Sequence, residues 1–399
     1  MLKPSLVLPI LSLLSIACST TPEIDTGKNV KLKVDKIESA AKLSEFIDSI
    51  NYIKLETTDK SFISEVSHVK MLKDNVVIFD DPQNAILCFD IKGNFKYKIK
   101  QVGKGPKEYI KISGFDIFNG VLAIHDRMTK KALFFNLKTG KFKNEIKIKY
   151  DFSSILMMED GFLAYTNNNP NLVKGKIPQN AEVYYFDYNG KIIDVLSRFP
   201  IYLNYVHDYN NYVFCRNMND VYFSPILTGR IYKFDKVKMH LDPILNLQLD
   251  NNNFFFNILK ELNSNSLPNG EFNARKTAIE ARDNSNEFYH SGPCCFINNK
   301  VFFMTVKQRK SHINIYNIDK NTLMTFRKIT NDIDNVFPFL FMMPLKGVYD
   351  NAFIYSITYD DIATFKNEGE HQLQYKKNIK ASMENPTIAI LNFKKHEEL

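Results

Sequence analysis

The chain has 399 residues, of which 44% are hydrophobic and 24% are charged. This composition is that of a globular protein and excludes a largely disordered chain. The formal net charge is +8. The lysines are scattered, however, so we expect no nucleic-acid partner, which would require cations gathered on one face. Abundant aromatic residues, 32 Phe and 20 Tyr, favour β-strands.

The N-terminus has the features of an export signal. An apolar run, residues 6–16, precedes Cys18 and is too short to span a bilayer. This segment resembles a bacterial lipoprotein signal, so we expect residues 1–17 to be removed, Cys18 to carry the lipid and residues 18–45 to form a tether. Two acyl chains would anchor the protein stably in the outer membrane of a Gram-negative cell envelope. The sequence does not indicate whether the protein faces the periplasm or the cell surface. The alternative is ordinary signal cleavage with Cys18 incidental.

The remaining cysteines give no disulfide framework. They are few for an exported protein, and each lies in an apolar, strand-like context. We therefore interpret them as small core residues. No Cys or His pair has ligand spacing with a second pair to complete it, so we expect neither a metal nor another cofactor. The four are Cys88, Cys215, Cys294 and Cys295.

A short pattern recurs along the chain, in which an apolar strand is followed by Asp or Asn and then by a turn. It is clearest in "ILCFDIKGNF", "ALFFNLKTGKF" and "VYYFDYNGKI", and weaker in "RIYKFD", "INIYNIDKNT" and "IAILNF". The Asp or Asn side chain can bond the backbone two residues on and so start the turn. A residue able to adopt positive φ then closes it. The turn starters are Asp90, Asn136, Asp187, Asp235, Asn317 and Asn392, and the closers are Gly93, Gly140, Gly190 and Asn321.

Each copy belongs to a unit of four strands, A to D. A second strand such as "VVIFDD" or "VLAIHD" precedes the copy, and a turn and another apolar run precede that strand. In the second unit the strands are expected at residues 114–118, 121–126, 131–136 and 141–148. Six units with a period of ~45–50 residues predict an all-β protein, a six-bladed β-propeller over residues 46–399.

The two ends of the chain are expected to meet. The sixth unit ends after its C strand, "PTIAILNF", and lacks a D strand. Residues 50–57, "INYIKLET", belong to no unit of their own. We expect this segment to pair with residues 386–393 and complete blade six, which leaves no unpaired edge at the seam. Two segments break the period and are predicted to be helical insertions, at about 250–292 and 361–385.

Three segments carry a resemblance to a known family. "NYIKLETTDKSFISEV", "VGKGPKEYIKISGFDI" and "ENPTIAIL" resemble the six-bladed β-propeller lipoproteins of Bacteroidetes, distant relatives of NHL-repeat propellers. The most distinctive piece is the "GxGPxEY" segment, Gly103 to Tyr109. The resemblance implies the fold and a cell-envelope location, but it carries no catalytic residue.

The glycine segment does not match a phosphate-binding loop. It contains neither GxxxxGK[ST] nor a GxGxxG that opens a helix. Pro106 also removes an amide donor that a phosphate cradle would use. We interpret the segment as a connector from strand D of blade one to strand A of blade two.

Propellers present the D-to-A connections and the B-to-C loops on one face, so that face is the default binding site. Cations outnumber acids among the candidate residues there, which favours a polar or anionic ligand. These candidates are Lys104, Lys107, Glu108, Tyr109, Arg127, His207, Asp208, Arg230, Lys307, Arg309 and Asp360.

Two functions stay open at this point. The first is a monomeric binding propeller for a glycan fragment, peptide or partner protein, and the second is a lyase or hydrolase on the same scaffold. Histidines at His125, His207 and His290 are the candidates for chemistry, with Asp126 and Asp208 beside the first two. A lone histidine is more often structural, and no GxSxG elbow is present.

Overall fold

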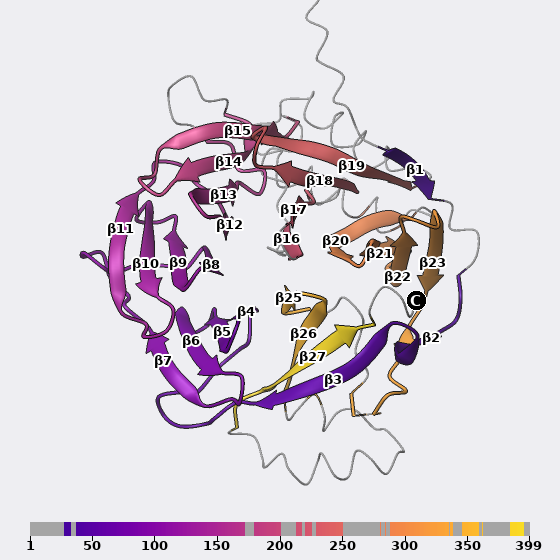
Figure 1. The fold of residues 1–399 in the computed structure, drawn as a ribbon, viewed down its shortest axis with the longest axis horizontal. Coiled ribbons are helices and arrows are strands. Elements are labelled where there is room, and N and C mark those ends of the chain that lie inside the picture. The colour runs from indigo at the N-terminus through magenta and orange to yellow at the C-terminus, as the bar shows by residue number, and fades with distance from the viewer. Residues whose placement is uncertain are drawn as a thin grey trace, which may run out of the picture.

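The chain folds as a six-bladed β-propeller (Figure 1). The computed structural model describes residues 28–32, 37–171, 179–200, 213–217, 220–225, 229–249, 280, 284, 288–334, 336–337, 345–358, 361 and 384–394. Six antiparallel sheets surround a central axis, each with its first strand innermost. The predicted fold class is therefore confirmed. The two predicted helical insertions, at about 250–292 and 361–385, lie mostly outside the described residues. The end of the first, residues 289–292, belongs to a strand instead of a helix.

The blades follow one another in sequence, and in each the strands run in order from the innermost to the outermost. Blade 1 has β4 (His68–Leu72), β5 (Asn75–Asp80), β6 (Ala85–Asp90) and β7 (Phe95–Ile99). Blade 2 has β8 (Gly114–Phe118), β9 (Val121–Asp126), β10 (Lys131–Asn136) and β11 (Phe142–Lys147). Blade 3 has β12 (Ser154–Met157), β13 (Gly161–Tyr165), β14 (Ala181–Asp187) and β15 (Ile192–Arg198). Blade 4 has β16 (Phe214–Asn217), β17 (Asp220–Phe223), β18 (Arg230–Asp235) and β19 (His240–Leu249). Blade 5 has β20 (Tyr289–Ile297), β21 (Lys300–Lys307), β22 (Lys310–Asn317) and β23 (Thr322–Phe326). Blade 6 has β25 (Gly347–Tyr349), β26 (Ala352–Ile357), β27 (Thr387–Phe393) and, from the other end of the chain, β3 (Ile47–Lys54).

The ring closes by pairing the two ends of the chain. β3 lies antiparallel to β27, with Ile53 opposite Ile388 and Asn51 opposite Ile390. The predicted closing strand is confirmed, but it begins and ends three residues earlier than residues 50–57. Pairing with β27 ends at Lys54 because the Glu56 N–H donates instead to the Gly93 carbonyl, at 2.8 Å, in the β6–β7 turn of blade 1.

The segment before β3 runs along the outer edges of two other blades. β1 (Lys28–Leu32) adds a parallel fifth strand to β19 of blade 4. Glu38 then bridges to Phe326 at the edge of blade 5, and β2 (Ala41–Lys42) pairs with β24 (Ile329–Thr330). A 3-10 turn, η1 (Leu43–Glu45), leads into β3. Residues 28–32 and 37–45 therefore belong to the propeller, although the sequence predicted a tether over residues 18–45.

The C-to-D turns form as predicted. Asp90 Oδ1 accepts the N–H groups of Lys92 at 2.8 Å and Asn94 at 2.9 Å, and Gly93 closes the turn with φ of +89°. A Cβ on Gly93 would lie 1.9 Å from the carbonyl oxygen of Lys54. Because Lys54 is the last residue of β3, this turn of blade 1 packs directly against the strand that closes the ring.

The core consists of apolar layers between neighbouring blades. At the seam, buried residues from the closing strand and its partner, such as Ile53 and Ile388, pack on buried residues of blade 1 such as Val76 and Phe89. Each fully buried aliphatic or aromatic side chain contributes about 1.5–3 kcal/mol relative to an exposed one. The four cysteines are buried and free, as expected of core residues.

Among the residues that the structure describes, no helix is both long and apolar enough to cross a membrane.

Replacing Gly93 with alanine tests the closing contact. Alanine at positive φ costs about 1–2 kcal/mol anywhere. At this position the new methyl also meets the Lys54 carbonyl. We therefore expect Gly93→Ala to lower the free energy of unfolding by about 3 kcal/mol or more in urea titration. Gly120→Ala is the matched control, because Gly120 has φ of +75° and a Cβ there would have no atom within 4 Å. Equal losses in the two variants would contradict the contact.

Candidate functional site

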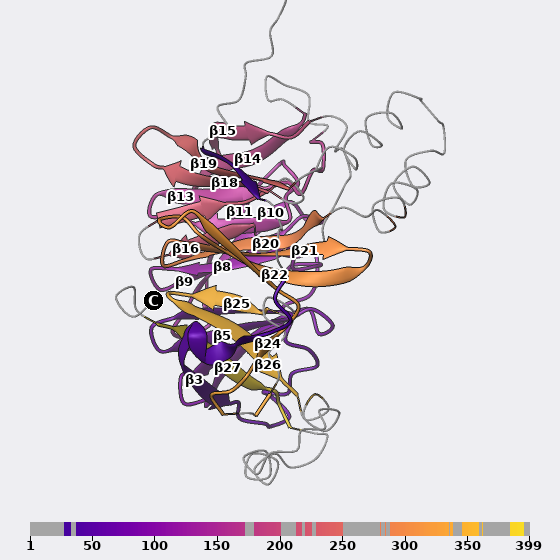
Figure 2. The same ribbon diagram turned by 90° about the vertical axis from the view of Figure 1, so that its right-hand side faces the viewer.

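The loops expected to bind ligands lie on one face, which we call the mouth face. It carries the connections from the outermost strand of one blade to the innermost strand of the next, and the loops between the second and third strands of each blade. In Figure 2 this face is on the right, where the β21–β22 hairpin projects. The predicted candidates within the described residues are distributed over several of these loops.

The glycine segment, residues 103–109, folds back on itself. Gly103 donates its N–H to the Tyr109 carbonyl and Tyr109 donates its own to the Gln101 carbonyl, both at 3.0 Å. The Glu108 carboxylate turns into this loop and accepts the Gly105 N–H at 2.8 Å. A Cβ on Gly103 would lie 2.0 Å from Glu108 Oε2. The first glycine of the segment therefore leaves room for the glutamate in this position.

Two further side chains fix this loop to the blades. Tyr109 is fully buried, and its hydroxyl lies 3.0 Å from the Asn84 carbonyl oxygen in blade 1. Lys131 in blade 2 is also buried and donates from Nζ to the Gly105 carbonyl at 2.8 Å, with the Glu145 carboxylate 3.4 Å away. The segment is thus a clasp between two blades. This agrees with its interpretation as a connector, and it gives Tyr109 a structural position in the core.

The charged residues of the clasp lie at the outer rim of the mouth face. The Lys107 N–H donates to Glu145 at 2.9 Å, and its ammonium lies 5.5 Å from the centre of the Phe142 ring. Both partners belong to β11, the outermost strand of blade 2 (Figure 1). Lys104 is exposed on the same connection, and Glu108 is engaged inside the loop. These residues therefore lie on the expected face, but at its outer rim rather than at the propeller axis.

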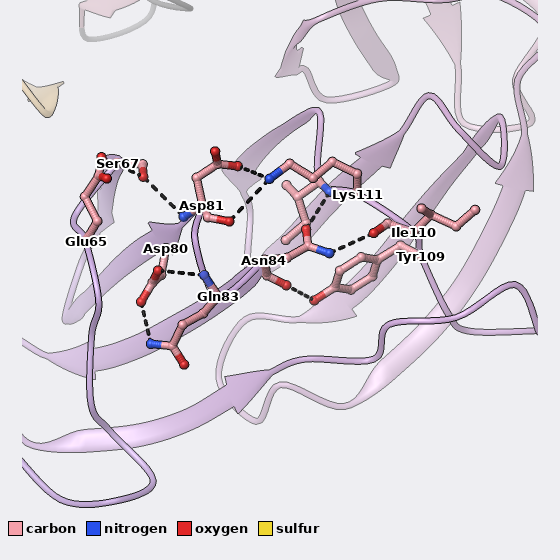
Figure 3. Close-up of polar contacts among 10 residues, drawn as sticks. Glu65, Ser67, Asp80, Asp81, Gln83, Asn84, Tyr109, Ile110 and Lys111 are labelled. Atoms are coloured by element: carbon pink, nitrogen blue, oxygen red, sulfur yellow. Dashed lines mark hydrogen bonds and ion pairs between the residues drawn. The ribbon is translucent and has the colours of Figure 1, made fainter.

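Acids at the ends of second strands cap the incoming connections. Asp80 is fully buried, and its carboxylate accepts the Ser64 N–H at 2.7 Å. It also accepts the Gln83 N–H at 3.1 Å (Figure 3). Asp126 occupies the same place in blade 2 and accepts the Ile110 N–H at 2.7 Å. Both carboxylates are satisfied by protein donors, so their role is to hold loops rather than to contact a ligand.

The rim between blades 1 and 2 is held by an amide side chain. Asn84 donates to the Ile110 carbonyl at 2.8 Å and accepts the Ile112 N–H at 2.9 Å. Beside it Asp81 forms an exposed ion pair with Lys111 at 2.5 Å (Figure 3). The polar groups of this rim thus bond mainly with one another.

The other predicted residues are spread over the mouth face. Arg127 is exposed in the β9–β10 loop, and Arg309 is exposed at the tip of the β21–β22 hairpin. Arg230 begins β18, near the buried Glu182. Burial raises the pKa of Glu182 to about 7, while the Ser197 hydroxyl and the Arg230 charge act in the opposite direction. Cys18, His207, Asp208 and Asp360 lie outside the described residues.

A charged cluster that the sequence did not single out lies at the axis. Asp116 in β8 is buried, and its Oδ1 lies 2.8 Å from Lys70 Nζ of β4. Its Oδ2 accepts the Met157 N–H of β12 at 2.7 Å and lies 3.8 Å from Arg216 of β16. The innermost strands of four blades therefore converge on one carboxylate. We call Lys70, Asp116 and Arg216 the axis cluster.

Arg216 reaches farthest within this cluster. From blade 4 its guanidinium donates to the Met157 carbonyl in blade 3, and it lies 4.6 Å from the centre of the Phe118 ring in blade 2. Arginine suits this position, because its planar charged group can stack on an aromatic face and donate in plane at once. Asp116 is matched by two cations, so the axis cluster carries a net positive charge.

Two more nitrogen groups lie where blades 6 and 1 meet at the mouth face. His68 begins β4, and Lys346 directly precedes β25. Burial, together with the charges of Lys70 and Lys346, lowers the pKa of His68 to about 4, while the charge of Asp81 acts in the opposite direction. Burial also lowers the pKa of Lys346, against the charges of Glu65 and Asp361. The neutral His68 ring thus lies in the field of two cations.

The sequence carried a weak signal for this group. Strands with the patterns "HVKML", "GFDIF" and "FCRN" each place one charged residue inside an otherwise apolar innermost strand. A charge at such a position indicates a partner across the axis, since an unpaired buried charge is costly. Which charges meet depends on how the blades are placed, and that is not readable from a single strand.

Two of the candidate histidines, His125 and His290, lie in buried, structural surroundings. His125 is fully buried and stacks on Phe152 with ring centroids 3.6 Å apart, and burial lowers its pKa to about 3. His290 lies within β20, with Nε2 3.1 Å from the Cys294 sulfur. Burial lowers the pKa of His290 to about 4 and raises that of Cys294 to about 12. At neutral pH this pair is an imidazole and a thiol, whereas a nucleophilic cysteine requires the thiolate.

No group of three or more His, Cys, Asp or Glu side chains within the described ranges could hold a metal ion.

Comparison with known proteins agrees with this architecture. The family model described as "Domain of unknown function (DUF4934)" matches residues 28–392. The chain belongs to the DUF4934 family. A solved structure of a candidate exported protein from Bacteroides fragilis NCTC 9343 is 16% identical, with a TM-score of 0.69 over 92% of this chain and 100% of that one. A DUF4221-family structure from Bacteroides vulgatus ATCC 8482 is 10% identical, with a TM-score of 0.49 over 87% and 97%. No curated protein matches the chain.

The family match confirms the predicted resemblance at the level of family and fold. The match begins at residue 28, the first residue of β1, so the segment along the outer edges of blades 4 and 5 lies within the DUF4934 region. The structural similarity to the Bacteroides fragilis protein supports the propeller fold alone, because the identity is low.

Removing the carboxylate of the axis cluster tests its role in this DUF4934 propeller. Asp116→Ala leaves Lys70, Arg216 and the Met157 N–H without their shared acceptor, so we expect a loss of about 3 kcal/mol in the free energy of unfolding. The control is Asp81→Ala, which breaks the exposed pair with Lys111 and should cost less than about 1 kcal/mol. A loss of under about 1 kcal/mol for Asp116→Ala would contradict the cluster.

Proposed function

We propose that this protein is a cell-envelope lipoprotein whose mouth face binds an anionic ligand at the propeller axis. The ligand would be a small molecule or an oligomer end that carries a carboxylate or a similar group. It would lie against His68, Lys70 and Lys346, where blades 6 and 1 meet. Binding rather than catalysis is the function that this arrangement supports.

The observation that carries the proposal is the electrostatic character of this site. Burial is the largest cause of the low pKa of His68, and the charges of Lys70 and Lys346 contribute in the same direction. The axis cluster below adds Arg216, and the Asp116 carboxylate offsets only part of this positive charge. A half-buried cation has lost part of its hydration, and a bound anion compensates for that loss. Hydrogen bonds between charged groups are also stronger than those between neutral groups.

His68 has a specific part in this proposal. Because its ring is neutral at physiological pH, it lines the site without adding a third charge to a crowded site. The acids Glu65 and Asp361, which act on Lys346, would disfavour ligands whose charge extends over the rim. A compact anionic group directed toward the axis fits both features.

The Lys346→Met variant tests the ligand class. Galacturonate and uncharged galactose are titrated into the protein by calorimetry. We expect galacturonate to bind and Lys346→Met to weaken that binding by about tenfold or more, as loss of a charge-assisted hydrogen bond implies. Lys104→Met, on the outer connection, is the matched control and should bind as the natural chain does. Equal binding of galacturonate and galactose would refute the proposal.

The lipid anchor is tested separately. The sequence around Cys18 supports acylation, and stable anchoring requires two acyl chains. In cells fed labelled palmitate, we expect label in the natural chain and in the membrane fraction, and a Cys18→Ala variant without either. Cys88→Ala controls for loss of an unrelated cysteine. Label retained by Cys18→Ala would refute the anchor and leave the ligand proposal untouched.

A further inference from the structure

The β21–β22 hairpin of blade 5 forms a projecting basic finger. Its strands have eight residues each, and it extends beyond the mouth face (Figure 2). The tip residues Gln308 and Arg309 have φ of +48° and +61°, and Lys307 pairs with Lys310 across the turn. Positive φ at both central residues is the mark of a tight type I′ turn, which holds the tip in one shape.

Four cations gather on and beside this finger. Lys307, Arg309 and Lys310 lie at its tip, and Arg327 follows β23 in the same blade. Burial lowers the pKa of His312, and the charges of Arg327, Lys307 and Lys310 contribute in the same direction. Within the described part of the chain, none of the four forms an ion pair with a carboxylate. The cations therefore repel one another without local compensation.

An aromatic ring holds one of the tip cations in place. The Lys307 ammonium lies 4.9 Å from the centre of the Phe288 ring, and that ring meets His312 edge-on with centroids 5.2 Å apart. A cation over an aromatic face is positioned rather than freely mobile, and the contact contributes about 0.5–1 kcal/mol at an exposed site. Preorganised cations lose less entropy when an anion binds.

We propose that this finger binds a linear acidic polysaccharide. Its ligand is distinct from the compact anion proposed for the axis, because the finger offers several separate cations on a convex tip. A chain with regularly spaced carboxylates can meet Lys307, Arg309 and Lys310 in turn. Binding would then gain from release of the counterions condensed on the polymer.

An acidic peptide fits the finger less well. Peptides are commonly held through their backbone at an open strand edge or through apolar pockets. At the tip the strands pair with each other, since Lys307 lies opposite Lys310, and the residues between them are exposed and polar. The tip thus carries positive charge, but it has no open strand edge that could pair with a peptide backbone.

The test measures binding to immobilised polygalacturonate by surface plasmon resonance. The full chain is compared with the triple variant Lys307→Gln, Arg309→Gln, Lys310→Gln, and with a control triple variant on other exposed lysines, Lys92→Gln, Lys138→Gln, Lys143→Gln. We expect the finger variant to lose at least about tenfold in affinity, and the salt dependence to fall by roughly one unit of slope for each cation removed. The control variant should bind within about twofold of the natural chain.

Two further arms make the outcome decisive. The single variant Arg309→Gln, at an exposed turn position, should give an intermediate loss at an unchanged melting temperature. Poly-glutamate and vesicles with anionic lipid headgroups are offered as competitors at equal charge, and we expect both to compete more weakly than free polygalacturonate. Unchanged binding by the finger variant, or stronger competition by poly-glutamate or vesicles, would overturn the proposal. Lys346→Met should not change this binding, which separates it from the axis site.

Discussion

The pairing of β3 with β27 is the constraint on which the rest of the structure depends. A propeller blade cannot bury both faces alone, so each blade needs a neighbour on either side. The sixth blade acquires its outermost strand from the opposite end of the chain, and so the ring closes only when segments more than three hundred residues apart come together. Such closure is entropically costly, and it is balanced by the apolar layer at the seam.

Several contacts act together at this seam. The C-to-D turn of blade 1 packs against the end of β3 at Gly93. Asn385, just before β27, donates to the Glu56 and Ser61 carbonyls at 2.7 and 2.8 Å and accepts the Ile63 N–H at 2.8 Å. One buried amide thus ties the start of β27 to the loop that follows β3. The "LETT" and "NP" segments of the sequence meet at this point, which explains why both accompany the fold.

Closure also determines what gathers at the axis. Lys70, Asp116 and Arg216 come from three different blades, and none of their strands could bring them together without the ring. Lys346 joins them from blade 6, whose position depends on β3. The proposed ligand site is therefore a product of ring geometry, in the way that binding sites of propellers in general lie where separate blades converge.

Most of the architecture was predictable from local chemistry. Turn starters such as Asp90 and closers such as Gly93 repeat, because each hairpin needs an acceptor for its turn amides and a residue at positive φ. The site was less predictable. Lys107 was expected on the mouth face, but the sequence did not show that its contact with Phe142 holds it at the outer rim of that face. Asp116 and Lys70 were missed because their significance depends on contacts between blades.

Hydrogen exchange across the seam tests the central claim most directly. If β3 is an integral strand of blade 6, amides of residues 47–54 and 387–393 should be protected together and exchange with one common opening free energy, close to that of the whole ring. Rapid exchange of residues 47–54 while residues 387–393 remain protected would contradict the account, because it would mean that the ring stands without its closing strand.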